Sequence, residues 1–328
     1  PKPGLLLRVA DQFGRQLNFT YDSQGRMTSM TDPAGGVYTY AYDEVSSIVL
    51  PGQQTAGNQT SVTYPDGKKR VYWYNEQDKT ANTNLPYALT GITDENGVRF
   101  ATYSYDATGK AISTEHAGGM DKYTVSYPNP KLHNIAVDPL GNARIYNFQT
   151  ILGVVKATGQ TQPAGAGSPA TSTTITYDAN GNIASRTDFN GMKTTYVYDL
   201  SRNLETNRNE AVGTPQARTI TTTWHATYRL PLSVTEPGKV TTFNYDSTGN
   251  LLQKTVTANG SSRKWTYTYN NAGQVLTATG PRTTVKNTTT HTSDGQGNVI
   301  TATDAAGLVK TMSNYDANGR VGRIVDAN

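Results

Sequence analysis

The sequence predicts an all-β fold of tandem β-hairpins that form one continuous, curved antiparallel sheet. Three observations predict it: a turn motif that recurs at a spacing near 21 residues, strands in which aromatic residues alternate with Thr, Val and Ala, and a composition with 31 Gly and 21 Tyr. Thr, Tyr and Val favour half-buried sheet surfaces, whereas Gly, Asn and Asp favour tight turns. We therefore expect a single repeat array over residues 1–328.

The turn motif is Tyr-Asp-x-x-Gly, followed two residues later by an apolar side chain. Tyr21 to Tyr42, Tyr177 to Tyr198 and Trp224 to Tyr245 are each 21 residues apart, which is the length of two strands and two turns. Half-units lack the Tyr and keep Asp-x-x-Gly. The predicted motif residues are Tyr21, Asp22, Gly25, Asp32, Gly35, Tyr105, Asp106, Gly109, Asp138, Gly141, Tyr177, Asp178, Gly181, Tyr198, Asp199, Tyr245, Asp246, Gly249, Tyr269, Gly273, Tyr315, Asp316 and Gly319.

The residue types of the motif match the demands of a four-residue β-turn. Asp at the first position accepts backbone N–H groups with its carboxylate, and Gly at the fourth position tolerates positive φ. Pro33 and Pro139 stand at the second position of two half-units, where the proline ring presets φ. Each repeat is therefore expected to be one β-hairpin.

Aromatic residues recur with a period of two between the turns. Tyr38 and Tyr40 alternate with Thr39 and Ala41, and Trp265 and Tyr267 keep the same rhythm. Residues two apart share one face of a strand, so an aromatic face is expected opposite a face of Thr, Val and Ala. The aromatic face is interpreted as packing and cross-strand contact. A platform that stacks sugar rings is the alternative.

The sequence offers no motif for chemistry. It has no Cys, its four His residues are widely separated, and it lacks the glycine-rich and nucleophile motifs of nucleotide-binding and hydrolytic enzymes. No catalytic, cofactor-binding or metal site is predicted, and the chain is not expected to be an enzyme. Its basic residues are scattered, apart from Lys68, Lys69 and Arg70, which disfavours nucleic acid as a partner.

The apolar runs are too short to span a bilayer, and no signal peptide is recognisable at the start, which is Pro1. We expect a fragment of a longer protein whose targeting signal lies outside it. Four stretches interrupt the repeat and are predicted to be loops or insertions, near residues 51–60, 79–86, 127–133 and 158–172.

The units resemble the YD repeats of the Rhs family, most closely in the stretch TTTWHATYRLPLSVTEPGKVTTFNYDSTGNL over residues 221–251. The resemblance covers essentially the whole chain. It implies a sheet that spirals into a hollow β-shell around a C-terminal toxin, as in bacterial Rhs polymorphic toxins, and related repeats occur in toxin complexes and teneurins. The terminal self-cleavage motif of that family is missing, since the similar string at Asp138 is followed by further repeats.

What the resemblance implies about function is a non-catalytic scaffold that encloses a toxin used in interbacterial competition. Its implied partners are the remaining repeats and the C-terminal toxin of the parent protein, together with a secretion spike protein and an immunity protein. The implied location is secreted or cell-surface, through type VI secretion. The alternative is a cell-surface module that binds carbohydrate through its aromatic face.

Overall fold

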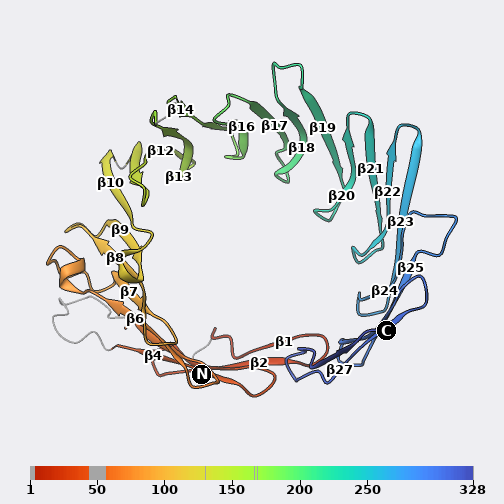
Figure 1. Ribbon diagram of the computed structural model, residues 1–328, viewed down its shortest axis with the longest axis horizontal. Helices are drawn as coiled ribbons and strands as arrows, with labels where there is room; N and C mark the ends of the chain where they lie inside the picture. Colours follow the sequence, from red (N-terminus) through yellow and green to blue (C-terminus); the bar gives the residue numbers. More distant parts are fainter. Residues whose placement is uncertain (1–3, 44–56, 130, 166, 168, 328) are drawn as a thin grey trace. The chain divides into compact units, whose positions relative to one another are not determined.

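The structure is a computed structural model that describes residues 4–43, 57–129, 131–165, 167 and 169–327. These residues form 28 β-strands and two short 3₁₀ helices, η1 (Gln77–Lys79) and η2 (Ala117–Gly119), and they contain no α-helix. The chain divides into two compact units, residues 1–146 and 147–328. Both are built from antiparallel hairpins (Figure 1), so the all-β fold predicted from the sequence is confirmed.

The strands form two antiparallel sheets of 14 strands, and each sheet follows the order of the chain. The first contains β1 (Arg8–Ala10), β2 (Gln16–Tyr21), β3 (Met27–Thr31), β4 (Val37–Tyr42), β5 (Gln59–Thr63), β6 (Lys69–Tyr74), β7 (Leu89–Thr93), β8 (Arg99–Tyr105), β9 (Ala111–His116), β10 (Tyr123–Asn129), β11 (His133–Val137), β12 (Ala143–Ile151), β13 (Val154–Gln162) and β14 (Thr171–Ser172). The second contains β15 (Thr174–Tyr177), β16 (Ile183–Thr187), β17 (Lys193–Asp199), β18 (Leu204–Glu210), β19 (Arg218–Trp224), β20 (Pro231–Glu236), β21 (Lys239–Tyr245), β22 (Leu251–Ala258), β23 (Ser261–Tyr269), β24 (Val275–Thr279), β25 (Thr288–Ser293), β26 (Val299–Thr303), β27 (Val309–Ser313) and β28 (Arg323–Val325).

The ladder of strand pairs is interrupted once, between β14 and β15, so the hairpins in chain order are described as two sheets. Strand β14 pairs with β13 through only two residue pairs, and the N–H of Thr173 then donates to the carbonyl of Gln160 at 2.8 Å. Gly159 has φ +149, and a Cβ placed there would lie 2.1 Å from the Thr173 oxygen. The two backbones approach so closely at this point that a regular ladder ends.

The two faces of the strands differ in composition as the alternation predicts. In β4, Tyr38, Tyr40 and Tyr42 are half-buried, whereas Val37, Thr39 and Ala41 are exposed. Cross-strand partners keep each row uniform, because residues directly opposite share a face. Tyr38 lies opposite Met30 on β3, and Thr39 lies opposite Ser29. The aromatic face and the Thr-rich face therefore both extend from strand to strand.

The Thr-rich face is held by hydroxyl contacts between strands. The Oγ atoms of Thr20 and Ser29 lie 2.7 Å apart, and Thr292 and Thr301 lie 2.6 Å apart. Only four apolar side chains are buried among the residues that the structure describes: Val62, Ala101, Leu204 and Ile220. Each sheet is a single layer, so hydrogen bonds and cross-strand pairs carry much of the stability that a packed core supplies in a globular domain.

A β-bulge recurs at the end of successive hairpins. The register shifts between Thr20 and Tyr21 in β2, and between Asn244 and Tyr245 in β21, each time just before the aromatic residue that ends the strand. A bulge bends its strand and increases the local twist. Within each unit the hairpins lie side by side along a curved path, as Figure 1 shows.

The predicted loops contain more regular structure than expected. Residues 51–56 of the first lie outside the described part of the chain, and Gln59 already begins β5. Residues 79–86 follow η1, residues 127–129 continue β10, and β13 runs to Gln162 before the segment that leads to β14.

Candidate functional site: the Tyr-Asp edge

The Tyr-Asp-x-x-Gly units all form turns at one edge of their sheet, here called the Tyr-Asp edge. Successive hairpins are antiparallel and in chain order, so connections alternate between the two edges. The turn after Tyr21 therefore lies at the edge opposite to the half-unit turn at Asp32. The structure does not gather the predicted motif residues into one cluster, because each copy closes its own hairpin.

The Asp22 turn shows how the motif works. The Gly25 N–H donates to the Asp22 carbonyl at 3.1 Å, and the Asp22 N–H donates to the Arg26 carbonyl at 2.9 Å. The carboxylate Oδ1 accepts the N–H groups of Gln24 and Arg26, both at 2.9 Å. Gly25 has φ +85, a conformation that glycine adopts without strain.

The same pattern recurs along the chain, with an acceptor from residue i bonded to the N–H groups of residues i+2 and i+4. The turns that show both bonds begin at Asp11, Asp22, Asp32, Asp94, Asp106, Asp138, Asp178, Asp188, Asp246, Asp294, Asp304 and Asp316, and at Asn270 with its amide oxygen. Asp199 shows the bond to Ser201 alone.

Hydrogen bonds to these carboxylates favour the ionised form. The Asn250 side-chain amide, with Thr248 and the turn backbone, lowers the pKa of Asp246 to about 2 against the opposing effect of desolvation. The Arg26 backbone N–H is the largest influence that lowers the pKa of Asp22. These carboxylates accept hydrogen bonds within their own turns. Their lowered pKa values therefore reflect stabilisation of the turns.

The motif tyrosines connect each hairpin to the one before it. The Tyr42 hydroxyl donates to the carbonyl of Met27 at 2.8 Å, and Met27 is the residue paired with Tyr21. In the second unit, the Tyr269 hydroxyl donates to the Leu251 carbonyl at 2.8 Å, and Leu251 pairs with Tyr245. The aromatic residue at the end of a hairpin's first strand thus donates to a carbonyl of the preceding hairpin. That carbonyl belongs to the residue paired with the corresponding aromatic residue of the preceding hairpin.

We call this set of bonds the tyrosine ladder. Its donors are Tyr21, Tyr42, Tyr74, Tyr105, Tyr127, Tyr177, Tyr245, Tyr269 and Tyr315 through their hydroxyls, and Trp224 through its indole N–H. Burial raises the pKa of Tyr105 and Tyr245, so the hydroxyls keep the proton that they donate. Ser293 takes the tyrosine position in one repeat, and its side chain is too short to extend to the carbonyl on the adjacent strand that a tyrosine would bind.

Side chains also join neighbouring turns along the Tyr-Asp edge of the second unit. The Asn180 amide donates to the Leu200 carbonyl at 2.8 Å, and the Gln274 amide donates to the Gly297 carbonyl at 2.7 Å. Leu152 and Leu230 each lie against the glycine of a following turn, Gly181 and Gly249, at 3.5 and 3.4 Å from the position of a Cβ. Hydrogen bonds and apolar contacts therefore join neighbouring turns along this edge.

Sequence reasoning missed several members of this edge. Tyr74 and Tyr127 are ladder donors whose turns have other sequences, and at the opposite edge Asp11 begins a half-unit turn that was not recognised. The available signal was an aromatic residue at the end of an alternating strand, at the repeat spacing. Trp224-His225 is a full Tyr-Asp equivalent in which both motif residues are replaced.

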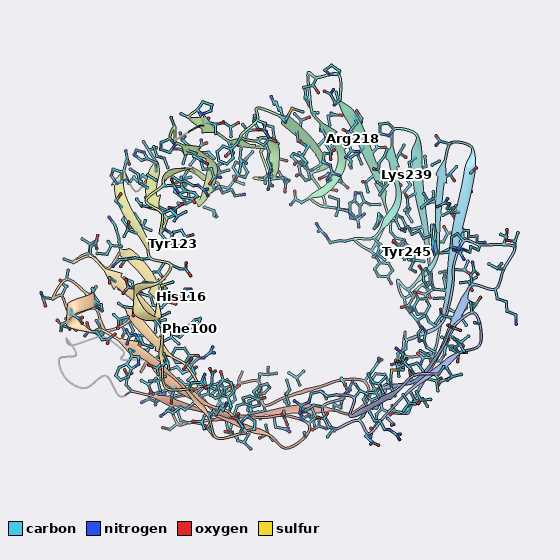
Figure 2. The ribbon with its side chains drawn as sticks, in the orientation of Figure 1. Phe100, His116, Tyr123, Arg218, Lys239 and Tyr245 are labelled. Carbon is cyan, nitrogen blue, oxygen red and sulfur yellow. The ribbon has the colours of Figure 1, made fainter. Side chains whose placement is uncertain are left out.

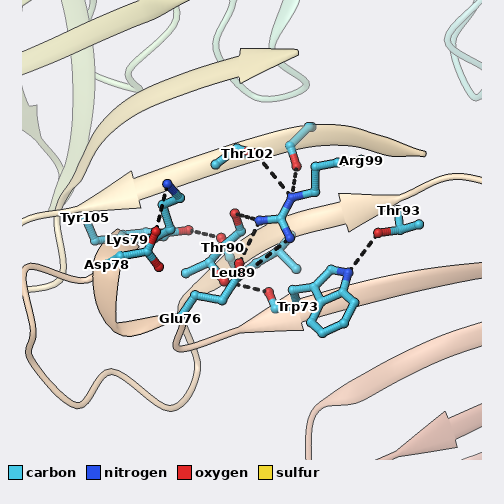
Figure 3. Close-up of polar contacts among 11 residues, drawn as sticks. Trp73, Glu76, Asp78, Lys79, Leu89, Thr90, Thr93, Arg99, Thr102 and Tyr105 are labelled. Carbon is cyan, nitrogen blue, oxygen red and sulfur yellow. Dashed lines mark hydrogen bonds and ion pairs between the residues drawn. The ribbon is translucent and has the colours of Figure 1, made fainter. Parts of the chain in front are cut away.

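A second polar cluster joins the segment between β6 and β7, residues 75–88, to strand β8 (Figure 3). The Arg99 guanidinium bonds Glu76 at 2.6 and 3.2 Å, and it also donates to the Thr90 carbonyl at 2.8 Å and the Ala101 carbonyl at 3.1 Å. Thr90 is fully buried, and its hydroxyl donates to the Trp73 carbonyl. Burial opposes ionisation of Glu76, but the bonds from Arg99 prevail and lower its pKa.

Beside this cluster, ring contacts join β8 and β9. The Phe100 and His116 ring centroids are 5.1 Å apart, and Figure 2 shows the two residues on adjacent strands. No group of His, Asp and Glu suited to a metal ion occurs among the described residues. In that same part of the chain, no helix has the length and apolar character needed to cross a membrane.

Similar repeats occur in a known protein family and in solved structures. The RHS Repeat family matches residues 4–37, 21–45, 177–215 and 245–285. No curated protein sequence matches the chain. Similar solved structures include a mutant Tc holotoxin pore of Photorhabdus luminescens, with 13% identity, a TM-score of 0.44, and coverage of 96% of this chain and 21% of that one.

Two further similar structures are TcdB2-TccC3, with 14% identity and a TM-score of 0.46, and TcdB2-TccC3-Cdc42, with 13% identity and a TM-score of 0.47. Each comparison covers 96% of this chain and 22% of the other. The chain thus spans about a fifth of the length of the structures that it resembles. The four matched regions contain repeated Tyr-Asp turns, so in these regions the chain is similar to the RHS repeat.

Proposed function

We propose that the chain is a non-catalytic scaffold segment of an RHS-type shell, which encloses and shields a C-terminal toxin. The observation that supports this most is the use of the motif residues. Their carboxylates accept backbone N–H groups and their hydroxyls bind carbonyls of the preceding hairpin, so the repeated polar groups are engaged in holding a sheet. A shell needs continuity of this kind over many hairpins.

In this proposal both units belong to one repeat array, and the partners are further repeats and the toxin of the same parent protein. The toxin serves competition between bacteria. The protein is exported by a type VI secretion system with a spike protein as carrier, and an immunity protein protects the producer. Sequestration acts physically, because a sheet without gaps between its strands excludes proteases from what it encloses.

Protease challenge of the parent protein tests the proposal. The C-terminal segment should survive digestion within the intact protein and be degraded when it is expressed alone. A matched variant, with Tyr245 and Tyr269 both changed to Phe, should weaken the ladder and shorten the survival of the segment. Rapid loss of the segment while the repeats stay folded would contradict sequestration.

The aromatic face supports the second candidate, carbohydrate binding. Tyr38 and Tyr40 are half-buried and thus partly open to solvent, and Tyr38 packs edge-on against Tyr64 with centroids 6.0 Å apart. Amphipathic rings of this kind stack on sugars. A glycan array with the wild type and with Tyr38 and Tyr40 changed to Ala tests it. Binding that is lost in a folded variant would favour this candidate over the scaffold.

A further inference from the structure

One turn of the Tyr-Asp edge is built on a histidine. In the β19–β20 hairpin, Trp224 occupies the tyrosine position: the register shifts just before it, and its indole N–H donates to the Glu205 carbonyl at 2.7 Å. His225 follows in the aspartate position, and its N–H donates to the Leu230 carbonyl at 2.8 Å, as the Asp22 N–H does to Arg26.

The imidazole performs the task of the carboxylate. Its Nδ1 accepts the N–H groups of Thr227 and Tyr228, both at 3.1 Å, where the Asp turns use Oδ1. An imidazole nitrogen accepts a hydrogen bond only while it carries no proton, and both nitrogens of the protonated ring are donors. Histidine changes charge between pH 5 and 8, whereas the Asp246 carboxylate of the next turn, with a pKa of about 2, stays an acceptor throughout that range.

The groups around His225 oppose a positive charge on its ring. Arg202, from the β17–β18 turn, donates to the carbonyls of His225 and Tyr228 at 2.8 and 3.0 Å. Arg229, from the same turn as His225, donates to the Arg202 carbonyl at 3.0 Å. The Tyr228 ring stacks on the imidazole with centroids 5.0 Å apart. Protonation would therefore add a third cation beside two guanidinium groups.

The nearby acidic groups are already engaged. Asp246 lies in the neighbouring turn, where the Ser247 carbonyl accepts the Tyr228 hydroxyl. Its carboxylate accepts the Thr248 N–H and the Asn250 side-chain amide of its own turn. Asp199, in the β17–β18 turn, accepts from Ser201. Glu205 on β18 lies 3.7 Å from Arg208. Each of these carboxylates is thus bound to groups other than the His225 ring.

We propose that the turn over residues 225–230 is an acid-sensitive joint of the Tyr-Asp edge, which opens when His225 takes up a proton. The folded turn requires the neutral ring, so a proton binds preferentially to the open form, and a lower pH favours opening. Opening also releases Arg202 and the Tyr228–Ser247 bond, which connect this turn to its neighbours on both sides. The joint is independent of whether the chain encloses a toxin.

Amide hydrogen exchange of the isotopically labelled chain tests the joint. Protection factors, corrected for intrinsic exchange at each pH, are measured at Thr227 and Tyr228 at pH 7.5 and 5.5. The Asp246 turn provides the internal reference through the Thr248 and Asn250 amides. We expect protection at Thr227 and Tyr228 to fall several-fold, up to the limit of about tenfold that one proton on an ordinary imidazole of the open form allows over this range. The reference amides should keep theirs.

The matched variant is His225→Asp, which restores the residue of the other turns and should remove the pH dependence. His225→Asn is the second variant, because Asn270 supports the same turn with an amide oxygen. Unchanged protection in the wild type, or an equal fall in either folded variant, would overturn the proposal.

Discussion

Gly91→Ala is expected to destabilise the first unit, because the Arg99 guanidinium occupies the space that a side chain would need. A Cβ on Gly91 would lie 1.8 Å from both Cζ and Nη2 of Arg99. Gly91 is a strand residue outside the left-handed region, so its backbone accepts alanine. The guanidinium must therefore move away from Glu76 and from the carbonyl of Thr90.

The magnitude follows from the bonds that are lost. Hydrogen bonds to charged groups contribute about 1.5–3 kcal/mol each. The Arg99 and Glu76 side chains are 30% and 31% exposed, so water replaces part of the interaction, and about 3 kcal/mol remains for the cluster. Alanine regains up to about 1 kcal/mol over glycine in a strand. The net loss is about 2 kcal/mol, which corresponds to roughly 4–8 °C in the melting temperature of a unit of this size.

Thermal and urea unfolding measure the effect, with Gly295→Ala as the matched control. Gly295 also lies outside the left-handed region and has no atom within 4 Å of its Cβ position, so the control should change stability by at most about 0.5 kcal/mol. The decisive comparison repeats Gly91→Ala in an Arg99→Ala background, where it should cost nothing. An equal loss in both backgrounds would refute the role assigned to Arg99.

Three further predictions concern the second unit. Tyr269→Phe should cost about 1 kcal/mol in urea unfolding, since the bond to the Leu251 carbonyl is lost, whereas Tyr267→Phe on the same face, outside the ladder, should be close to neutral. The pKa of Asp246 is lowered to about 2, so its contribution to stability is complete above about pH 4 and is lost as the pH falls towards 2. Asp246→Asn should keep the turn and remove that acid-dependent loss of stability, which an NMR-monitored titration measures. Ser293→Tyr should restore a ladder donor facing the Val275 carbonyl, the partner of Tyr269, and raise the midpoint of unfolding; an unchanged midpoint would show that the ladder does not limit stability there.

The fold could be predicted because its determinants are local. Alternation around Tyr38 and Tyr40 assigns the two faces, and Asp22 and Gly25 specify a turn by their own chemistry. The tyrosine ladder could not be predicted from the same residues, because its acceptors are backbone carbonyls that any residue supplies. Whether Tyr42 reaches Met27 depends on the bulge and the strand register, which appear only when the hairpins are paired.

The His225 turn and the Arg99 cluster were missed for a different reason. Both depend on substitutions that look unremarkable in sequence: a histidine after a tryptophan, and a glycine within a strand. Their meaning comes from what surrounds them, two N–H groups for Nδ1 and a guanidinium over Gly91. The division at Thr173 likewise depends on a close backbone approach that no side-chain pattern encodes.

The direction of the tyrosine ladder has a mechanical consequence. Each rung holds a hairpin to its predecessor, so tension applied to the chain end loads the rungs one after another, as in a zipper. Pulling from the C-terminus should release Tyr315 from Val299 first and then meet the repeat of Ser293, where a rung is missing. At that point the force needed to peel the next hairpin should drop, before it rises again at Tyr269.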